Sequence, residues 1–345
     1  MIYNTIPNTD VKVSNICLGT MTFGKQNSIQ DAHKQIDLAL HNGVNFIDVA
    51  EMYPVPATAD TYGITEDFIG HWIKKSGKRH EIVLATKIAG ANRNMEYIRE
   101  DMRYNDATIR LSVEKSLQRL QTDYIDLYQL HWPERKTNMF GQLGYINEND
   151  NYVDNIYDVL QTIQQLIEEG KIRHFGLSNE TPWGIMRFLF ESEKHTLPKA
   201  VTLQNPYSLL NRSLEVGISE ICNRENVGVL AYSPLAFGQL TGKFLNNQHP
   251  KDARLSLFPQ FMRYNSEQSL QAVALYNDIA EKHNISLTQL SLAFLQQQKV
   301  VTSTIIGATT LAQLQENIDA FAIVLSKEIL DEIDTVQKRF PNPAP

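Results

Sequence analysis

Short apolar runs alternate with longer amphipathic segments along most of this 345-residue chain. Eight of the runs are apolar throughout, which is typical of strands that are buried on both faces. They cover residues 16–22, 45–50, 82–87, 124–131, 172–179, 200–206, 227–234 and 303–307. In the segments between them, apolar residues recur every three or four positions, which predicts helices. These segments include residues 29–41, 65–75, 106–120, 156–169, 181–195, 215–226 and 266–283.

This repeated order of strand and helix predicts an α/β protein with a parallel sheet covered by helices. Eight strands favour closure into a (β/α)8 TIM barrel over an open doubly wound sheet. The open alternative is further weakened because Gly19 and Gly24 do not form a Gly-x-Gly-x-x-Gly motif after the first strand. We therefore predict a single barrel domain over residues 1–345, with a β-hairpin within residues 1–13.

Two long segments interrupt the alternation, and three glycines mark expected helix ends. Residues 132–154 and 236–265 contain the Gly, Pro and Asn residues that are typical of loops. Both follow predicted strands, so we expect them at the carboxyl-terminal face of the barrel, where they would select the substrate. Gly43, Gly170 and Gly228 are each expected to end a helix in the left-handed conformation.

Composition narrows the class of protein. The chain is 42% hydrophobic, which suits a large core, and its net charge of −7 argues against a nucleic-acid binder. Its two cysteines, Cys17 and Cys222, form neither a disulfide framework nor a metal-binding spacing. The chain begins without a secretory pattern and has no membrane-length apolar stretch. We expect a cytoplasmic protein without metal, nucleic-acid or membrane partners; the sequence leaves its oligomeric state open.

Polar residues that suit carbonyl chemistry stand at the ends of three consecutive predicted strands. Asp48, Lys87 and His131 close these strands, and Tyr53 follows the first. In a parallel barrel such ends meet at one mouth. There the Lys87 ammonium would lower the pKa of the Tyr53 phenol, Asp48 would pair with Lys87, and His131 would bond the same carbonyl oxygen. Taken one at a time, these residues equally suit packing, solvation or helix capping.

The later strands end in groups that could recognise an amide. Ser178, Asn179 and Gln204 can bond a carboxamide, and Tyr232 can stack on a nicotinamide ring. The alternative for Ser178 and Asn179 is that they cap the following helix.

The last predicted strand leads through glycine and hydroxyl residues into a helix. Gly307 and Thr309 stand before this helix, which contains Gln313 and Asn317. Such a helix start can bind an anion, and barrels often hold phosphate after their last strands. A short turn with an ordinary N-cap is the alternative.

Five dispersed motifs resemble those of the aldo-keto reductases. They are residues 18–24, 46–53, 126–132, 170–179 and 231–235. The resemblance covers nearly the whole chain, and residues 48–56 and 204–213 are similar to a bacterial member of that family.

This resemblance implies a barrel with its hairpin over the bottom, extended NADP(H), and reduction of a small carbonyl substrate. It implies a catalytic set of Asp48, Tyr53, Lys87 and His131, in which Tyr53 is the general acid and nicotinamide supplies hydride. It implies a cofactor-binding set of Ser178, Asn179, Gln204, Tyr232, Ser233, Leu235, Gly307, Thr309, Gln313 and Asn317.

One departure from the family pattern concerns the 2′-phosphate of NADPH. Many members grip it with a lysine and an arginine, where this chain has Gly307 and Gln313. Lys243 or Arg254, from the loop after the seventh strand, are the candidate replacements.

Two other functions stay open for this barrel. One is a cofactor-binding regulatory subunit that resembles the potassium-channel β subunits, and the other is a lyase or isomerase. The substrate itself is not defined by the sequence. Met139, Phe140 and Tyr145 indicate either an aromatic-tolerant mouth or a loop packed onto the barrel.

Overall fold

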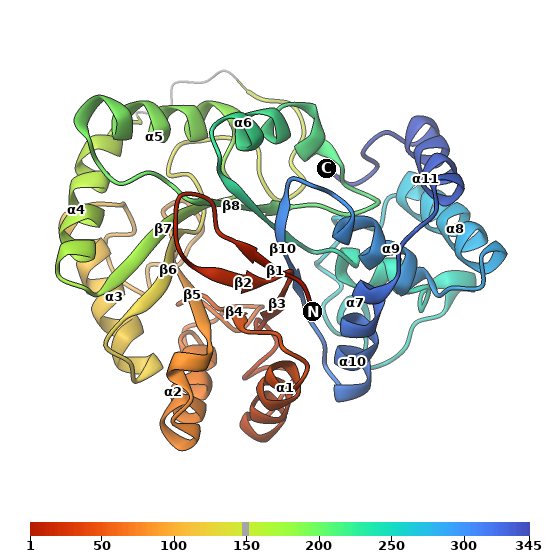
Figure 1. Cartoon of the computed structure of the whole chain (residues 1–345), viewed down its shortest axis with the longest axis horizontal. Helices are drawn as coiled ribbons and strands as arrows, with labels where there is room; N and C mark the ends of the chain where they lie inside the picture. The colour runs from red at the N-terminus through yellow and green to blue at the C-terminus, as the bar shows by residue number, and fades with distance from the viewer. Residues whose placement is uncertain (147–151) are drawn as a thin grey trace.

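The predicted barrel is present in the computed structural model, which describes residues 1–146 and 152–345. Part of the predicted loop 132–154, residues 147–151, lies outside the described residues. Eight parallel strands form a closed ring in which neighbours in the chain are neighbours in space (Figure 1). They are β3 (Ile16–Gly19), β4 (Phe46–Asp48), β5 (Val83–Ile88), β6 (Ile125–Leu130), β7 (Ile172–Ser178), β8 (Thr202–Pro206), β9 (Gly228–Tyr232) and β10 (Val301–Ile306). All eight coincide with predicted apolar runs.

The expected hairpin covers the amino-terminal end of the barrel. Strands β1 (Tyr3–Thr5) and β2 (Lys12–Ser14) pair antiparallel, and they lie across the ring of strands in Figure 1. Ile6 from the hairpin loop is buried with barrel residues that include Cys17 and Phe46. The Ser303 hydroxyl donates to the Ser14 carbonyl at 2.8 Å, which ties the hairpin to β10. The other end of the barrel is thereby left as the open face.

Helices surround the ring of strands (Figure 1). They are α1 (Ile29–His41), α2 (Ile64–Ser76), α3 (Asp106–Leu120), α4 (Ile156–Glu168), α5 (Pro182–His195), α6 (Ile218–Arg224), α7 (Arg254–Leu257), α8 (Glu267–Lys282), α9 (Leu287–Gln296), α10 (Leu311–Asp319) and α11 (Lys327–Arg339). Within the described part of the chain, no helix is both long and apolar enough to cross a lipid bilayer.

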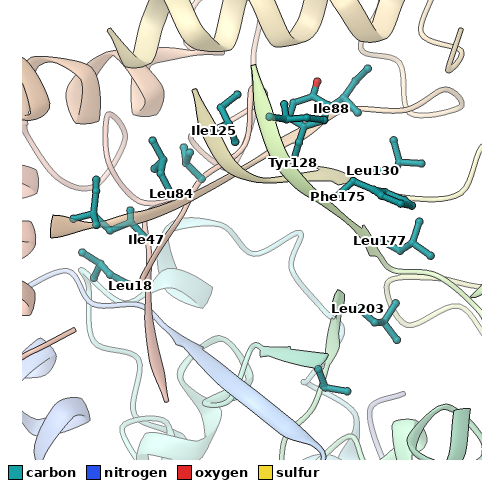
Figure 2. Packing of buried hydrophobic residues seen from close by; sticks show 14 of the residues in the cluster. Leu18, Ile47, Leu84, Ile88, Ile125, Tyr128, Leu130, Phe175, Leu177 and Leu203 are labelled. Atoms are coloured by element: carbon teal, nitrogen blue, oxygen red, sulfur yellow. The ribbon is translucent and has the colours of Figure 1, made fainter. Parts of the chain in front are cut away.

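Alternation along the strands divides the core into two layers. Leu18, Ile47 and Leu84 face the surrounding helices, and Figure 2 shows this packing. Their neighbours Cys17 and Phe46 belong to a separate cluster inside the barrel. Successive strand residues point to opposite faces of the sheet. The two clusters are apolar, and the strands also carry the buried polar residues Asp48, Lys87, Gln129 and Gln204.

The helix predictions are most accurate where a side-chain cap fixes the end of the helix. Helix α1 begins after Ser28, whose side chain forms a capping box with Asp31, and its bounds match the prediction. The predicted helix 215–226 is wrong in extent. A 3₁₀ turn (Ser213–Val216) is separated by Gly217 from the short α6, whose first turn has no side-chain cap.

Two of the three predicted glycine caps are confirmed. Gly43 and Gly170 have φ values of 83° and 74°, in the left-handed region. The prediction for Gly228 is wrong, because it lies in β9 and the left-handed residue before it is Asn226, with φ of 54°. A Cβ atom on Gly228 would lie 2.6 Å from the Thr302 Oγ1 atom, so close strand packing requires glycine there.

Close packing between α2 and α3 gives a test of the fold. A Cβ atom on Gly70 would lie 2.1 Å from the Arg119 backbone carbonyl oxygen, which cannot rotate away. We expect Gly70→Ala to lower the free energy of unfolding by about 1–3 kcal/mol. The control is Gly217→Ala, where a Cβ atom meets nothing within 4 Å and a change below about 1 kcal/mol is expected. Urea unfolding followed by circular dichroism measures both, and equal losses would contradict the packing argument.

Candidate active site

The carboxyl ends of the strands surround one large pocket. Its volume is about 1410 Å³, and it is lined by Asp48, Tyr53, His131 and Tyr232 among others. This exceeds the roughly 300–1,000 Å³ of a pocket for one drug-sized ligand. Every predicted site residue except Lys87 contributes to the lining. The structure therefore brings the two predicted sets together in one place.

Lys87 lies beneath the pocket floor in an ion pair with Asp48. Its ammonium is completely buried and lies 2.6 Å from the Asp48 Oδ2 atom and 2.8 Å from the Val49 carbonyl oxygen. Gln129 and Gln204 donate to the Asp48 Oδ1 atom at 3.2 Å and 2.8 Å. Burial alone would lower the pKa of Lys87, but Asp48 raises it on balance. The predicted buried pair is thus present, and further hydrogen bonds support both of its members.

Tyr53 lies between this ion pair and His131. The Lys87 ammonium is 5.0 Å from the centre of the Tyr53 ring, and the Tyr53 and His131 rings are 5.9 Å apart. Burial raises the pKa of the Tyr53 phenol above its ordinary value, and attraction to Lys87 offsets only part of that. The expectation of a lowered pKa is therefore wrong in its net direction, because the sequence does not reveal the depth of burial. The phenol keeps its proton at neutral pH.

His131 is held neutral at the same wall of the pocket. Burial, together with the positive charges of Lys87 and Arg93, places the pKa of its imidazole well below the ordinary value. The buried Nδ1 atom has no hydrogen-bond partner among the described residues. A neutral imidazole offers one donor and one acceptor, so His131 has unused bonding capacity beside Tyr53.

The amide-recognising residues form a network of their own. Tyr232 donates its hydroxyl to the Asn179 Oδ1 atom at 2.6 Å, and the Asn179 amide donates to the His131 carbonyl oxygen at 2.9 Å. The Ser178 hydroxyl donates to the Gln204 backbone carbonyl at 2.9 Å. Helix α5 is capped instead by Thr181, so the capping alternative for Ser178 and Asn179 is wrong. These contacts fix the side chains at the pocket wall before any ligand binds.

The turn after β10 is closed by its own side chains. The Gln313 Oε1 atom accepts from both the backbone N–H and the hydroxyl of Thr309, each at 3.0 Å. Asn317 donates to the Gly307 carbonyl oxygen at 3.2 Å, and Thr310 caps α10. The ordinary N-capped turn is thus present, and it also lines the pocket next to Ser233 and Leu235.

The loop after β9 contributes two cations to the pocket. The Arg254 guanidinium lies over the rings of Phe237 and Phe261, at 4.5 Å and 4.9 Å, and it contacts the Met21 sulfur at 3.6 Å. Burial lowers its pKa to about 10, and no described carboxylate pairs with it. Burial also lowers the pKa of Lys243.

The loop after β6 contributes only part of the expected apolar mouth. Phe140 lines the pocket, and its ring is 6.4 Å from that of Trp132. Met139 packs against the small cluster around Trp132, whereas Tyr145 is 66% exposed. Both interpretations of this loop therefore hold, each for a different residue.

Three positions were missed at the sequence level. Gln129 is a polar residue inside an apolar strand, and this contrast could have identified it as a site residue from the sequence. Glu51 accepts from the Ala89 backbone N–H and from Arg99, both at 2.6 Å, and so ties the segment after β5 to the segment that carries Tyr53. Arg93 lines the pocket from an irregular segment, where no pattern in the sequence indicates it.

Comparison with known proteins identifies the family. The model of the aldo/keto reductase family matches residues 15–338. The chain belongs to the aldo/keto reductase family. Its members are oxidoreductases that are typically NAD(P)H-dependent.

Full-length relatives of this aldo/keto reductase occur in bacteria. Protein tas of Escherichia coli (strain K12) is 49% identical over 346 residues, which cover 100% of both chains. Uncharacterized oxidoreductase YrpG of Bacillus subtilis (strain 168) is 34% identical and covers 99% of this chain and 97% of its own. Aldo-keto reductase YhdN of the same organism is 30% identical, with 97% and 93% covered. The resemblance to a bacterial member is thereby confirmed.

The buried ion pair can be tested without any assay of activity. Asp48→Asn leaves the Lys87 charge buried without its partner, so we expect a loss of about 3–5 kcal/mol in the free energy of unfolding. The double variant Asp48→Asn with Lys87→Met removes both charges and should be more stable than Asp48→Asn alone. Urea unfolding at pH 7 measures both. A double variant that is no more stable than Asp48→Asn alone would contradict the cost assigned to the unpaired Lys87 charge.

Proposed function

We propose that this aldo/keto reductase reduces aldehyde or ketone carbonyls with NADP(H), with Tyr53 as the general acid, and that residues 1–345 act as one domain. The observation that carries the proposal is the meeting of three groups at one pocket. A protonated phenol, a neutral imidazole and the buried Lys87–Asp48 pair converge there, although they come from different strands.

Each of these groups has a distinct task at the carbonyl. Tyr53 donates its proton to the developing alkoxide oxygen, and its raised pKa keeps that proton available. As the phenolate forms, attraction to the Lys87 ammonium stabilises it, and Asp48 keeps Lys87 charged in its buried position. His131 bonds the carbonyl oxygen and orients it.

The remaining pocket fits an extended dinucleotide. Its volume of about 1410 Å³ leaves room beside the carbonyl site. The pre-positioned Asn179 and Ser178 and the ring of Tyr232 would hold the nicotinamide end, which supplies hydride when the cofactor is bound. Arg254 would meet a phosphate, because its buried Nε atom has no partner among the described residues.

The general-acid role predicts the effect of removing one hydroxyl. We expect Tyr53→Phe to lower substrate-dependent NADPH oxidation by about 10²- to 10⁴-fold, in the range of lost general-acid catalysis. A panel of aldehydes, ketones and quinones, followed at the NADPH absorbance, measures it. Tyr62→Phe is the matched control, since Tyr62 packs near Tyr97 and does not line the pocket.

Two results would contradict this assignment. If Tyr53→Phe retained full turnover, another group would have to supply the proton. If the native protein bound NADPH tightly and no carbonyl raised its oxidation, the cofactor-binding regulatory subunit would be favoured instead.

The choice between NADPH and NADH tests Arg254. We expect Arg254→Ala to weaken NADPH binding about 10- to 100-fold while NADH binding changes little, because one charge-assisted contact is worth roughly 1.5–3 kcal/mol. Fluorescence titration with both nucleotides measures the ratio of dissociation constants. Lys251→Ala, at an exposed position of the same loop, is the control. An unchanged ratio would exclude Arg254 and leave Lys243 as the candidate.

A further inference from the structure

Arg93 presents a cation to the pocket from the segment that follows β5. Its guanidinium carbon lies 4.4 Å from the centre of the Phe140 ring and 5.7 Å from that of Trp132. Both rings line the same pocket. These aromatic contacts engage the guanidinium through the ring faces, so they leave its five N–H donors available.

Those donors have no partner within the described part of the chain. Nearby arginines behave differently, since Arg99 pairs with Glu51 at 2.6 Å and Arg103 pairs with Asp101 at 2.9 Å. For Arg93, the contacts within residues 1–146 and 152–345 are the two aromatic ones. The Arg93 side chain lines the pocket but is exposed, and partial desolvation lowers the pKa of its guanidinium.

The position of Arg93 separates it from the proposed phosphate-binding cations. Lys243 and Arg254 come from the loop after β9, whereas Arg93 follows β5, on the other side of the closed ring. Trp132 is a neighbour of both Arg93 and His131, and its ring is 4.7 Å from that of His131. The guanidinium is thus one aromatic ring away from the residue proposed to orient the carbonyl.

We propose that Arg93 binds a carboxylate of the substrate, so that the preferred substrates are carbonyl compounds with a carboxylate at the far end of a short or aromatic spacer. This inference rests on the proposed function. The planar guanidinium matches a carboxylate with two parallel hydrogen bonds, and Trp132 and Phe140 contact the spacer between the two groups.

Two aldehydes that differ in one charge test whether Arg93 binds a substrate carboxylate. The native enzyme should reduce 4-formylbenzoate with a higher kcat/KM than its uncharged methyl ester. We expect Arg93→Gln to lower kcat/KM for the carboxylate about 10- to 100-fold, because it removes one charge-assisted contact. The kcat/KM for the methyl ester should not change. Arg93→Lys should restore part of the preference. Arg103→Gln removes the same charge from an exposed position nearby and should have no effect.

Binding without turnover keeps this test independent of the reductase proposal. Calorimetric titration should show that the native protein binds benzoate more tightly than benzamide, and that Arg93→Gln abolishes the difference. This result would support the carboxylate site even if no aldehyde were reduced. The absence of aldehyde reduction would then contradict the proposed function and not the role of Arg93. Equal reduction of acid and ester by the native enzyme, or a preference that survives in Arg93→Gln, would overturn the role of Arg93.

Discussion

The buried ion pair between Lys87 and Asp48 is the constraint on which the site depends. A lysine charge with no exposure to water is costly unless an anion and further hydrogen bonds compensate it. Here the carboxylate comes from β4 and the ammonium from β5, while Gln129 of β6 and Gln204 of β8 complete the carboxylate's bonds. The four strands meet in this way only when the barrel is closed and in register. The geometry of the site therefore requires a closed barrel.

The same pair sets the protonation of its neighbours. Burial is the largest influence on the pKa of Tyr53 and outweighs the attraction that Lys87 exerts, which Asp48 partly offsets, so the phenol stays protonated. His131 stays neutral for a related reason, since burial and two nearby cations both oppose its protonation. The pocket thus holds neutral groups next to a compensated charge. Such a site can stabilise negative charge that develops on a bound oxygen, because the Asp48 carboxylate beneath Tyr53 is already paired with Lys87.

The sequence predicted what periodicity and strand ends encode. All eight strands were found because each is buried on both faces, and Asp48, Lys87 and His131 were found because they lie at or within one residue of the ends of three strands. The features it missed depend on three-dimensional neighbours. Gly228 is required by the approach of Thr302 from another strand, and the direction of the Tyr53 pKa shift depends on how deeply the ring is buried. Neither quantity has a local signature.

The arrangement of charge in the pocket illustrates the same limit. The chain has a net charge of −7, yet Arg93 and Arg254, which pair with no carboxylate of the described residues, bring positive charge to the pocket from loops that follow opposite strands of the ring. A sum over the sequence cannot reveal this, because the effect of a few cations on a bound molecule depends on where the fold places them and not on the total charge. Since Tyr53 and His131 lie at the same pocket, anions held by these two cations would leave the reacting centre between them. The orientation of a bound molecule would then follow from where two irregular loops place their arginines, and these loops are the part of the chain that periodicity describes least.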